Sequence, residues 1–222
     1  MKAEQYKRKD RTMHIAEYFY TAKIVKPLLP IIAQTRITPN MVTIFNSFLA
    51  MYIFYLSYSQ RYTVVAILIQ VYLFLDILDG NLARYKNMKS NLGAKLDSIN
   101  DRIFYSLIFI FVGITEVPWY LIISVILLVN IYGILATFYI VPKLRQLKAI
   151  RRRGIKKFFM DKGFIIGMDL GTVDILMTVF LLLGRIRILY IILIIGFIFD
   201  IIVRLRELWW NERLEKASKF NY

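Results

Sequence analysis

Residues 63–83 read TVVAILIQVYLFLDILDGNLA, an apolar run long enough to cross a bilayer that nevertheless ends with two aspartates. A charged carboxylate inside such a span costs about 2.5–3.5 kcal/mol on insertion scales, so it needs a compensating partner or a function. After a short polar stretch, Asp97 and Asp101 open the next apolar run. The four acids therefore predict a site at one end of two consecutive membrane helices.

The spacing of the four aspartates places each pair on one helix face. Asp76 and Asp79 are three residues apart, and Asp97 and Asp101 are four apart, which are the separations of neighbours on a helix surface. The connection at 85–92 is short, so we expect the two helices to run antiparallel with these faces converging. Converging carboxylates suit hard cations such as Mg²⁺, Mn²⁺ or Ca²⁺. The alternative is a set of polar residues that joins the helices through ion pairs.

Small residues and one arginine accompany the aspartates. Gly80 and Gly93 leave room for a ligand to approach the backbone, and Ala83 adds little bulk to the same region. The guanidinium of Arg84 offers a fork of donors suited to a phosphate group. Together these features predict a site for a phosphorylated ligand and a divalent cation.

The composition indicates a membrane protein. Of the 222 residues, 58% are hydrophobic, whereas a soluble domain has about 45–50%. The 30 lysines and arginines against 15 aspartates and glutamates give a net charge of +15, which suits loops that face anionic membrane lipids. Apolar spans separate these basic residues, which argues against nucleic-acid binding. The absence of cysteine excludes thiolate chemistry, and the single histidine, His14, cannot form a histidine metal site.

Six segments are apolar and long enough to span a bilayer, which takes about 20 residues each. Before them, residues 14–34 contain lysines as well as Pro27 and Pro30, and we interpret this stretch as an amphipathic interfacial helix broken by the prolines. The sequence therefore predicts a single all-α integral membrane domain over residues 1–222. The expected spans are 39–58, 63–83, 96–115, 118–141, 164–183 and 187–205.

The distribution of positive charge predicts the orientation in a cell membrane. Eight lysines and arginines occur in residues 1–39, nine in 143–162, four in 84–95 and five from Arg204 onward, whereas the alternate loops contain few. Because cytoplasmic loops carry the excess of positive charge, we expect both termini and the aspartate site on the cytoplasmic side of a multi-pass protein.

The stretch from Asp76 to Asp101 resembles a known family signature. Its pattern D-x2-D-G-x2-A-R-x8-G-x3-D-x3-D matches, at every fixed position, the motif of the CDP-alcohol phosphotransferase family. Pro39, Asn40 and Thr43 resemble the P-N-x-x-T element of the same family. The resemblance implies a metal-dependent enzyme that transfers a phosphoalcohol group from a CDP-linked donor to a hydroxyl acceptor and releases CMP.

The resemblance also implies roles for the matching residues. Asp101 is expected to be the general base that deprotonates the acceptor, and homodimers are implied as the assembly. Two Mg²⁺ or Mn²⁺ ions, bridged by the pyrophosphate of the donor, would be held by Asp76, Asp79, Asp97 and Asp101. The nucleotide would be bound by Asn40, Thr43, Gly80, Ala83, Arg84 and Gly93.

The resemblance leaves the acceptor open. Residues 96–102 resemble members that use inositol phosphate, and glycerol phosphate is a second expected acceptor, with CDP-diacylglycerol or an ether-lipid equivalent as donor. Members that use phosphorylated acceptors have a K-x-R pair after the fourth span, which Lys143 and Arg145 resemble. The alternative for this pair is an ordinary positively charged loop that contacts anionic lipids.

The chain departs from those members at the start of the fifth expected span. Asp169 and Asp174 occur where further arginines are usual, so Arg152 and its basic neighbours would have to supply the positive charge. The two acids are expected either to bind hydroxyls or an amine of an unphosphorylated acceptor, or to pair with a structural partner.

Two further patterns concern helix packing. Gly163, Gly167 and Gly171 are spaced four residues apart and would form a ridge where helices approach closely, within a protomer or at a dimer contact. Asp200 and Arg204 are expected to form an ion pair one helical turn apart.

Other functions remain as alternatives to phospholipid synthesis. The same chemistry could place a CDP-linked headgroup on a lipid or a glycan. A divalent cation transporter is a more distant alternative, because intramembrane acids also mark ion paths. A transporter, however, would be expected to spread its acids through the membrane depth, whereas these four cluster at one end of two spans.

Overall fold

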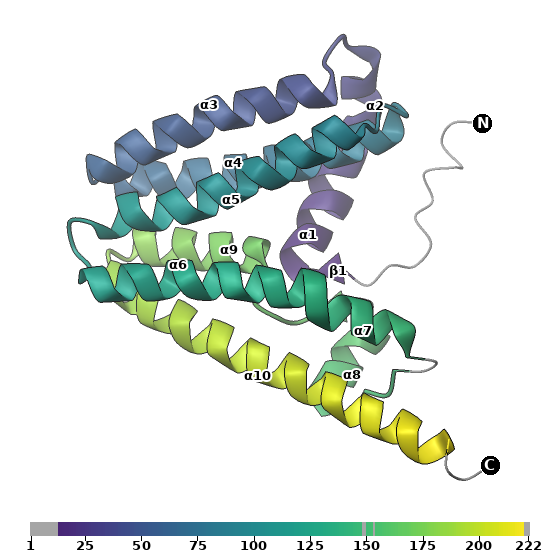
Figure 1. Ribbon diagram of the computed structural model, residues 1–222. Coiled ribbons are helices and arrows are strands. Elements are labelled where there is room, and N and C mark those ends of the chain that lie inside the picture. The colour runs from purple at the N-terminus through teal and green to yellow at the C-terminus, as the bar shows by residue number, and fades with distance from the viewer. Residues whose placement is uncertain (1–12, 148–149, 153, 220–222) are drawn as a thin grey trace.

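The computed structural model describes residues 13–147, 150–152 and 154–219, and its fold is a bundle of helices (Figure 1). The predicted all-α class is confirmed, with one addition in this part of the chain: β1 (Met13–His14) pairs in parallel with β2 (Phe164–Ile165). The helices are α1 (Ile15–Phe19), the π-helical η1 (Tyr20–Val25), α2 (Lys26–Gln34), α3 (Pro39–Tyr58), α4 (Tyr62–Tyr85), α5 (Asn91–Gly113), α6 (Trp119–Ile134), the π-helical η2 (Leu135–Ile140), α7 (Val141–Gln146), α8 (Gly154–Asp161), α9 (Leu170–Leu182) and α10 (Ile186–Lys219).

Within the described residues, four helices are long and apolar enough to cross a membrane. Helices α3 and α4 are two of them, and α6 continues through η2 and α7 to form the third, Trp119–Gln146. The fourth covers Ile186–Ala217 of α10. These helices correspond to the predicted spans 39–58, 63–83, 118–141 and 187–205.

The other two predicted spans also contain helices, but neither meets these criteria of length and composition. Helix α5 covers most of 96–115, and its first half carries Lys95, Asp97, Asp101 and Arg102. Helix α9 has only 13 residues, because residues 164–169 form β2 and an extended segment before it. The count of six spans therefore stays a prediction.

Residues 15–34 form one continuous helical stretch, so the expected break at the prolines is wrong. Pro27 is the second residue of α2 and directly follows the π-helical turn η1. Pro30 lies inside α2. One face of the stretch packs on α3 and α4, since Val25 and Leu29 are fully buried in a small cluster with Val42, Leu78 and Leu82. The interfacial location of this helix stays a prediction.

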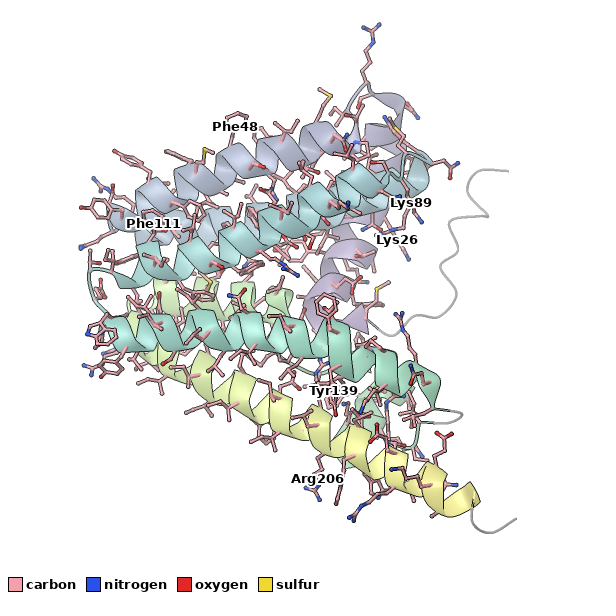
Figure 2. The ribbon with its side chains drawn as sticks, viewed as in Figure 1. Lys26, Phe48, Lys89, Phe111, Tyr139 and Arg206 are labelled. Carbon is pink, nitrogen blue, oxygen red and sulfur yellow. The ribbon has the colours of Figure 1, made fainter. Side chains whose placement is uncertain are left out.

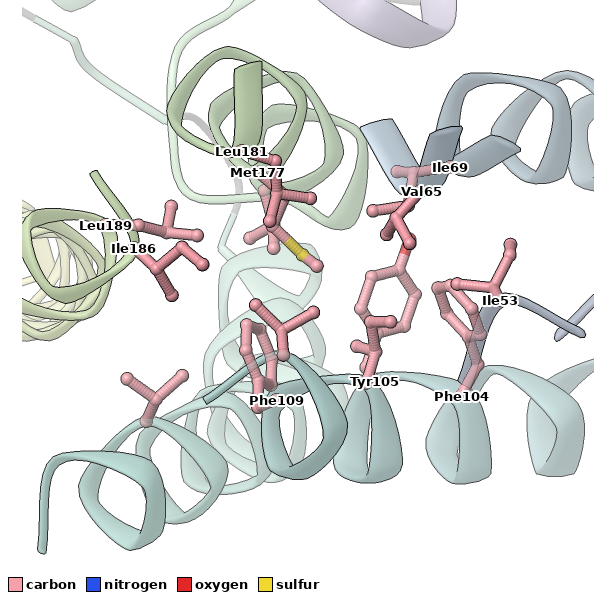
Figure 3. Packing of buried hydrophobic residues seen from close by; sticks show 14 of the residues in the cluster. Ile53, Val65, Ile69, Phe104, Tyr105, Phe109, Met177, Leu181, Ile186 and Leu189 are labelled. Carbon is pink, nitrogen blue, oxygen red and sulfur yellow. The ribbon is translucent and has the colours of Figure 1, made fainter. Parts of the chain in front are cut away.

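The main apolar core joins α3, α4, α5, α6, α9 and α10 (Figure 3). Tyr72 of α4 stacks on Phe104 of α5 with ring centroids 3.7 Å apart. Figure 3 shows Phe104, Tyr105 and Phe109 projecting from α5 toward the side chains of the neighbouring helices. The stack fixes the separation of α4 and α5 one turn away from the aspartates.

The predicted ion pair of Asp200 and Arg204 is confirmed, and it is part of a larger contact. Asp200 Oδ2 lies 3.1 Å from Arg204 Nε. The same oxygen accepts hydrogen bonds from the Tyr132 hydroxyl of α6 at 2.7 Å and from the Met168 backbone N–H at 3.0 Å. One carboxylate therefore joins α10, α6 and the segment before α9.

The prediction that three glycines form a ridge on one helix is wrong, because α9 begins at Leu170, after the first two of them. Gly163 lies in a turn with φ 84°, and Gly167 lies in the segment before α9. A Cβ atom at Gly167 would lie 2.9 Å from the guanidinium of Arg204 and 3.0 Å from Asp200 Oδ2. Gly167 thus allows the segment to approach the Asp200 ion pair, and only Gly171 lies in α9.

We expect Asp200→Ala to destabilise the protein by about 3–5 kcal/mol, because the change leaves a half-buried arginine and two other donors without their acceptor. Arg206→Ala is the matched control, since Arg206 is exposed on the same helix (Figure 2) and its loss should cost less than about 0.5 kcal/mol. Thermal and denaturant unfolding in detergent would measure both changes. Equal stability of the two variants would contradict the structural role of Asp200.

Candidate active site

Three of the four predicted aspartates meet at one point. Asp76 lies near the end of α4, and Asp97 and Asp101 lie in the first half of α5. Each offers a carboxylate oxygen within 4.8 Å of the others. Helix α3 packs against both α4 and α5, and the three aspartates are half-buried. The expected convergence of two helix faces is therefore present for these three acids.

Asp79 neighbours this group without belonging to it, and its side chain is held by a residue of α3. It is 5% exposed, and its Oδ2 accepts a hydrogen bond of 2.6 Å from the Thr43 hydroxyl. The sequence marked Thr43 as a nucleotide-binding residue but gave no sign of this contact. Thr43 therefore fixes the orientation of a carboxylate, whatever else it contacts.

The start of α3 is held in place by local caps and by the end of α4. Thr38 is the N-cap of α3, and its hydroxyl accepts from the Met41 backbone N–H at 3.3 Å. Lys86, directly after α4, donates to the carbonyl oxygens of Thr35 and Ile37 at 2.9 and 2.8 Å. These contacts set Asn40 and Thr43 opposite the aspartate end of α4.

A pocket of about 390 Å³ opens beside the carboxylates, within the size range of small-molecule sites. Asp79 and Asp97 line it. All six residues predicted to bind the nucleotide line it as well, namely Asn40, Thr43, Gly80, Ala83, Arg84 and Gly93. Sequence reasoning missed the contribution of the α4–α5 connection, of which Met88 and Lys89 also line the pocket. The structure thus places an arginine and two carboxylates around a pocket that is large enough for a small molecule.

Gly93 lies in a closely packed part of this pocket. Ser90 is the N-cap of α5, and its hydroxyl accepts from the Gly93 N–H at 2.9 Å. A Cβ atom at Gly93 would lie 3.0 Å from Ser90 Oγ and 3.3 Å from Asn40 Oδ1. A side chain here would therefore disturb both the cap and Asn40. Gly80 is less crowded, because the nearest atom to a Cβ placed there would belong to the Arg84 guanidinium, 3.7 Å away.

None of the five predicted acceptor residues lines this pocket, and four of them contact partners elsewhere. Lys143 Nζ lies 3.5 Å from Glu212 of α10, and Arg152 Nε lies 3.3 Å from Glu207 of the same helix. Arg145 is exposed on α7. The neighbouring Lys148 and Arg153 lie outside the described residues. A role of these residues in acceptor binding stays a prediction.

The two acids of the fifth segment also have structural partners. Asp169 Oδ1 lies 3.2 Å from His14 Nδ1 and accepts a hydrogen bond from the Thr172 hydroxyl. Asp174 is fully buried, and its Oδ2 accepts a hydrogen bond of 2.7 Å from the Tyr105 hydroxyl. Of the two predictions for these acids, the structural pairing is the one that these contacts show.

Comparison with known proteins agrees with this geometry. The family model described as CDP-alcohol phosphatidyltransferase matches residues 36–202, which include the pocket and all four aspartates. The chain belongs to the CDP-alcohol phosphatidyltransferase family. The family is of a transferase type that acts on CDP-alcohol donors, and the apolar helices together with this membership indicate a membrane protein.

Two curated relatives match part of the chain. A protein of Pyrococcus horikoshii named archaetidylinositol phosphate synthase is 38% identical over 84 residues, which are 36% of this chain and 45% of that protein. An uncharacterised protein of Aquifex aeolicus is 30% identical over 95 residues, which are 43% of this chain and 48% of that protein. The chain thus spans about half of the length of these curated relatives.

We expect Thr43→Val to weaken transferase activity by roughly 10- to 150-fold, because the change removes a hydrogen bond of about 1.5–3 kcal/mol to a carboxylate while preserving side-chain size. Thr43→Ser is the matched control, since it retains the hydroxyl and should retain most of the activity. The rate of CMP release at fixed donor concentration measures both. Activity of Thr43→Val close to that of the original protein would show that the hydrogen bond to Asp79 is not important, and equal losses in the two variants would show only that this position tolerates neither change.

Proposed function

We propose that the protein transfers the phosphatidyl, or an equivalent ether-lipid, group from a CDP-linked lipid to inositol phosphate and releases CMP. The observation that carries this proposal is the meeting of three carboxylates beside a pocket of nucleotide size. Glycerol phosphate is the second candidate acceptor. The named activity of the Pyrococcus relative and the resemblance of residues 96–102 favour inositol phosphate.

The carboxylates fit a divalent metal. Three acids within 4.8 Å repel one another when charged, and hard cations prefer carboxylate oxygens. We propose that Asp76, Asp97 and Asp101, together with the neighbouring Asp79, hold two Mg²⁺ or Mn²⁺ ions. When bound, such ions neutralise the charge of the donor's diphosphate and polarise the reacting phosphorus.

The pocket residues are proposed to bind and orient the CDP group. The Arg84 guanidinium can donate a fork of hydrogen bonds to phosphate oxygens. Gly93 lets the ligand approach the first turn of α5, and Asn40 offers an amide within the same pocket. Holding the donor beside the carboxylates supplies the alignment on which phosphoryl transfer chiefly depends.

Asp101 is proposed to be the general base. It accepts the proton of the acceptor hydroxyl, whose oxygen forms a bond to the phosphorus that carries the lipid. The bond from that phosphorus to the bridging oxygen breaks, and CMP leaves as a phosphate monoester with that oxygen. Asp101 suits this role because it belongs to the carboxylate group and also lines a cavity of about 130 Å³ between α5, α6 and the start of α9, which is open to an acceptor.

Several features of the surroundings remain part of the proposal. We place the active site and both termini on the cytoplasmic side of a cell membrane, from the positive charge of the loops. Lys143 and Arg145 are proposed to attract the phosphate of the acceptor, with exchange of the contact to Glu212. A homodimer is proposed from the family resemblance.

Two alternatives are weaker. Transfer to an unphosphorylated acceptor would need free polar groups near the site, whereas Asp169 and Asp174 have partners within the chain. A divalent cation transporter would need acids along a path through the membrane, but the group of three lies at one end of α4 and α5 beside a nucleotide-sized pocket.

The proposal is tested by measuring CMP release from CDP-dioleoylglycerol, or from its dialkyl ether equivalent, with a panel of acceptors. We expect release with inositol phosphate, loss of release with excess chelator, and recovery when Mg²⁺ or Mn²⁺ is added back. Serine and unphosphorylated inositol are the matched negative acceptors. Full activity in excess chelator would exclude the metal-dependent reaction, and release with serine alone would exclude the phosphorylated acceptor.

We expect Asp101→Asn to lower turnover by a factor of about 10² or more, which is the scale of losing a general base. The substitution keeps the size of the side chain, so CMP should still bind with an affinity within a few-fold of the original protein. Steady-state turnover and CMP inhibition measure the two effects separately. Turnover close to that of the original protein would show that another group is the base.

A further inference from the structure

A basic pocket lies where the segment before α8 meets α10. It has a volume of about 660 Å³, and none of the residues that line it also lines the nucleotide pocket. Three basic side chains and one acid line it, namely Arg151, Arg152, Lys157 and Asp161. Figure 1 shows α8 beside the later part of α10, where Lys156 of α8 bonds to Glu207. The pocket is therefore separate from the nucleotide pocket and the carboxylates.

One wall of the pocket is fixed to α10 by a buried amide. Asn211 is 2% exposed, and its side-chain oxygen accepts a hydrogen bond of 2.7 Å from the Arg151 backbone N–H. Its side-chain N–H donates to the Arg151 carbonyl at 3.1 Å and to the Glu207 carbonyl at 2.9 Å. These bonds hold the backbone of Arg151, while this residue stays exposed. The wall is thus formed by the fold itself, without a ligand.

The pocket has an excess of positive charge. Glu207 pairs with Arg152, whose Nε lies 3.3 Å away, and also with Lys156. Within the described part of the chain, Arg151 and Lys157 form no ion pair. Even with the acid that lines the pocket, basic side chains are in the majority. Guanidinium and ammonium groups in this arrangement suit the oxygens of a phosphate.

The length of α10 places the pocket at the level of the lipid headgroups. At a rise of about 1.5 Å per residue, Glu207 lies roughly 30 Å along α10 from Ile186, which is the thickness of the hydrocarbon core. Trp209 is 54% exposed, and the guanidinium of Arg213 lies 3.7 Å from the centroid of its ring. Tryptophan is enriched where a span meets the membrane surface. Glu207 and Asn211, which hold the pocket, therefore lie at this boundary.

Helix α8 adds apolar surface at the same boundary. Phe158 is 54% exposed, and Lys162 Nζ lies 4.2 Å from the centroid of its ring. The residue before it, Lys157, lines the pocket. An exposed aromatic side chain among basic residues is typical of a helix that lies in the membrane surface. One short helix thus offers an apolar group to the membrane and a cation to the pocket.

We infer that this pocket binds the phosphate group of an anionic phospholipid from the surrounding leaflet. The positive charge selects a phosphate, and the depth selects one that is attached to a membrane lipid. A phosphate in solution carries the same kind of charge, but it lacks the acyl chains that hold a lipid beside Phe158. A zwitterionic lipid is disfavoured, because its headgroup cation would face the same arginines.

Native mass spectrometry of the whole protein in detergent micelles measures the binding of single lipids. We expect dioleoylphosphatidylglycerol to bind at least about 10-fold more tightly than dioleoylphosphatidylcholine. Combining Arg151→Gln with Lys157→Gln should weaken binding of the anionic lipid by about 30-fold, since each basic side chain near a membrane surface contributes roughly 5-fold. Both residues are exposed, so the variant should fold. Combining Arg151→Lys with Lys157→Arg keeps the charge and should retain binding to within about 3-fold.

Arg185→Gln with Arg187→Gln is the matched control, because these exposed arginines lie at the opposite end of α10. It removes the same charge and should change lipid binding by less than about 2-fold, since the distance exceeds the screening length. Equal losses in the two neutralised variants, or equal binding of the two lipids, would overturn the site. Complete displacement of the lipid by an equal concentration of glycerol phosphate would assign the pocket to a soluble phosphate instead. The measurement needs no turnover, so its failure would leave the proposed function intact.

Discussion

The structure depends on one electrostatic constraint, which is that acids placed in apolar helices must be close enough to be neutralised together. Asp76, Asp97 and Asp101 satisfy it by meeting within 4.8 Å. The separation of α4 and α5 that permits this meeting is fixed one turn away by the stacked rings of Tyr72 and Phe104. The carboxylates thus add repulsion that the aromatic core beneath them has to oppose.

Features that repeat over one or two helical turns could be predicted from the sequence. The three- and four-residue spacings of the aspartates indicated a common face, and the structure brings three of the acids together. The pair of Asp200 and Arg204 was predictable for the same reason, since residues four apart on a helix are neighbours. The location of Asn40 and Arg84 in one pocket agrees with what the family resemblance implied.

Contacts between distant segments could not be predicted in this way. Thr43 binds Asp79 across 36 residues, and Lys143 contacts Glu212 of α10 rather than a site in the pocket. The start of α9 was missed because residues 164–168 carry no charge and are mostly apolar, while the pairing of β2 with β1 holds Phe164 and Ile165 in an extended conformation. Composition alone does not distinguish such a strand from the first turn of a helix.

The parallel bridge has a consequence for the order in which the chain matures. Met13 pairs with Phe164, and His14 contacts Asp169, so the first described residues complete their contacts only with residues about 150 positions later. A growing chain exposes its amino-terminal part first. The segment around His14 therefore stays without its partner strand until the helices from α1 to α8 have been made. Release of a nascent chain before residue 164 would leave this end of the molecule without its partner strand.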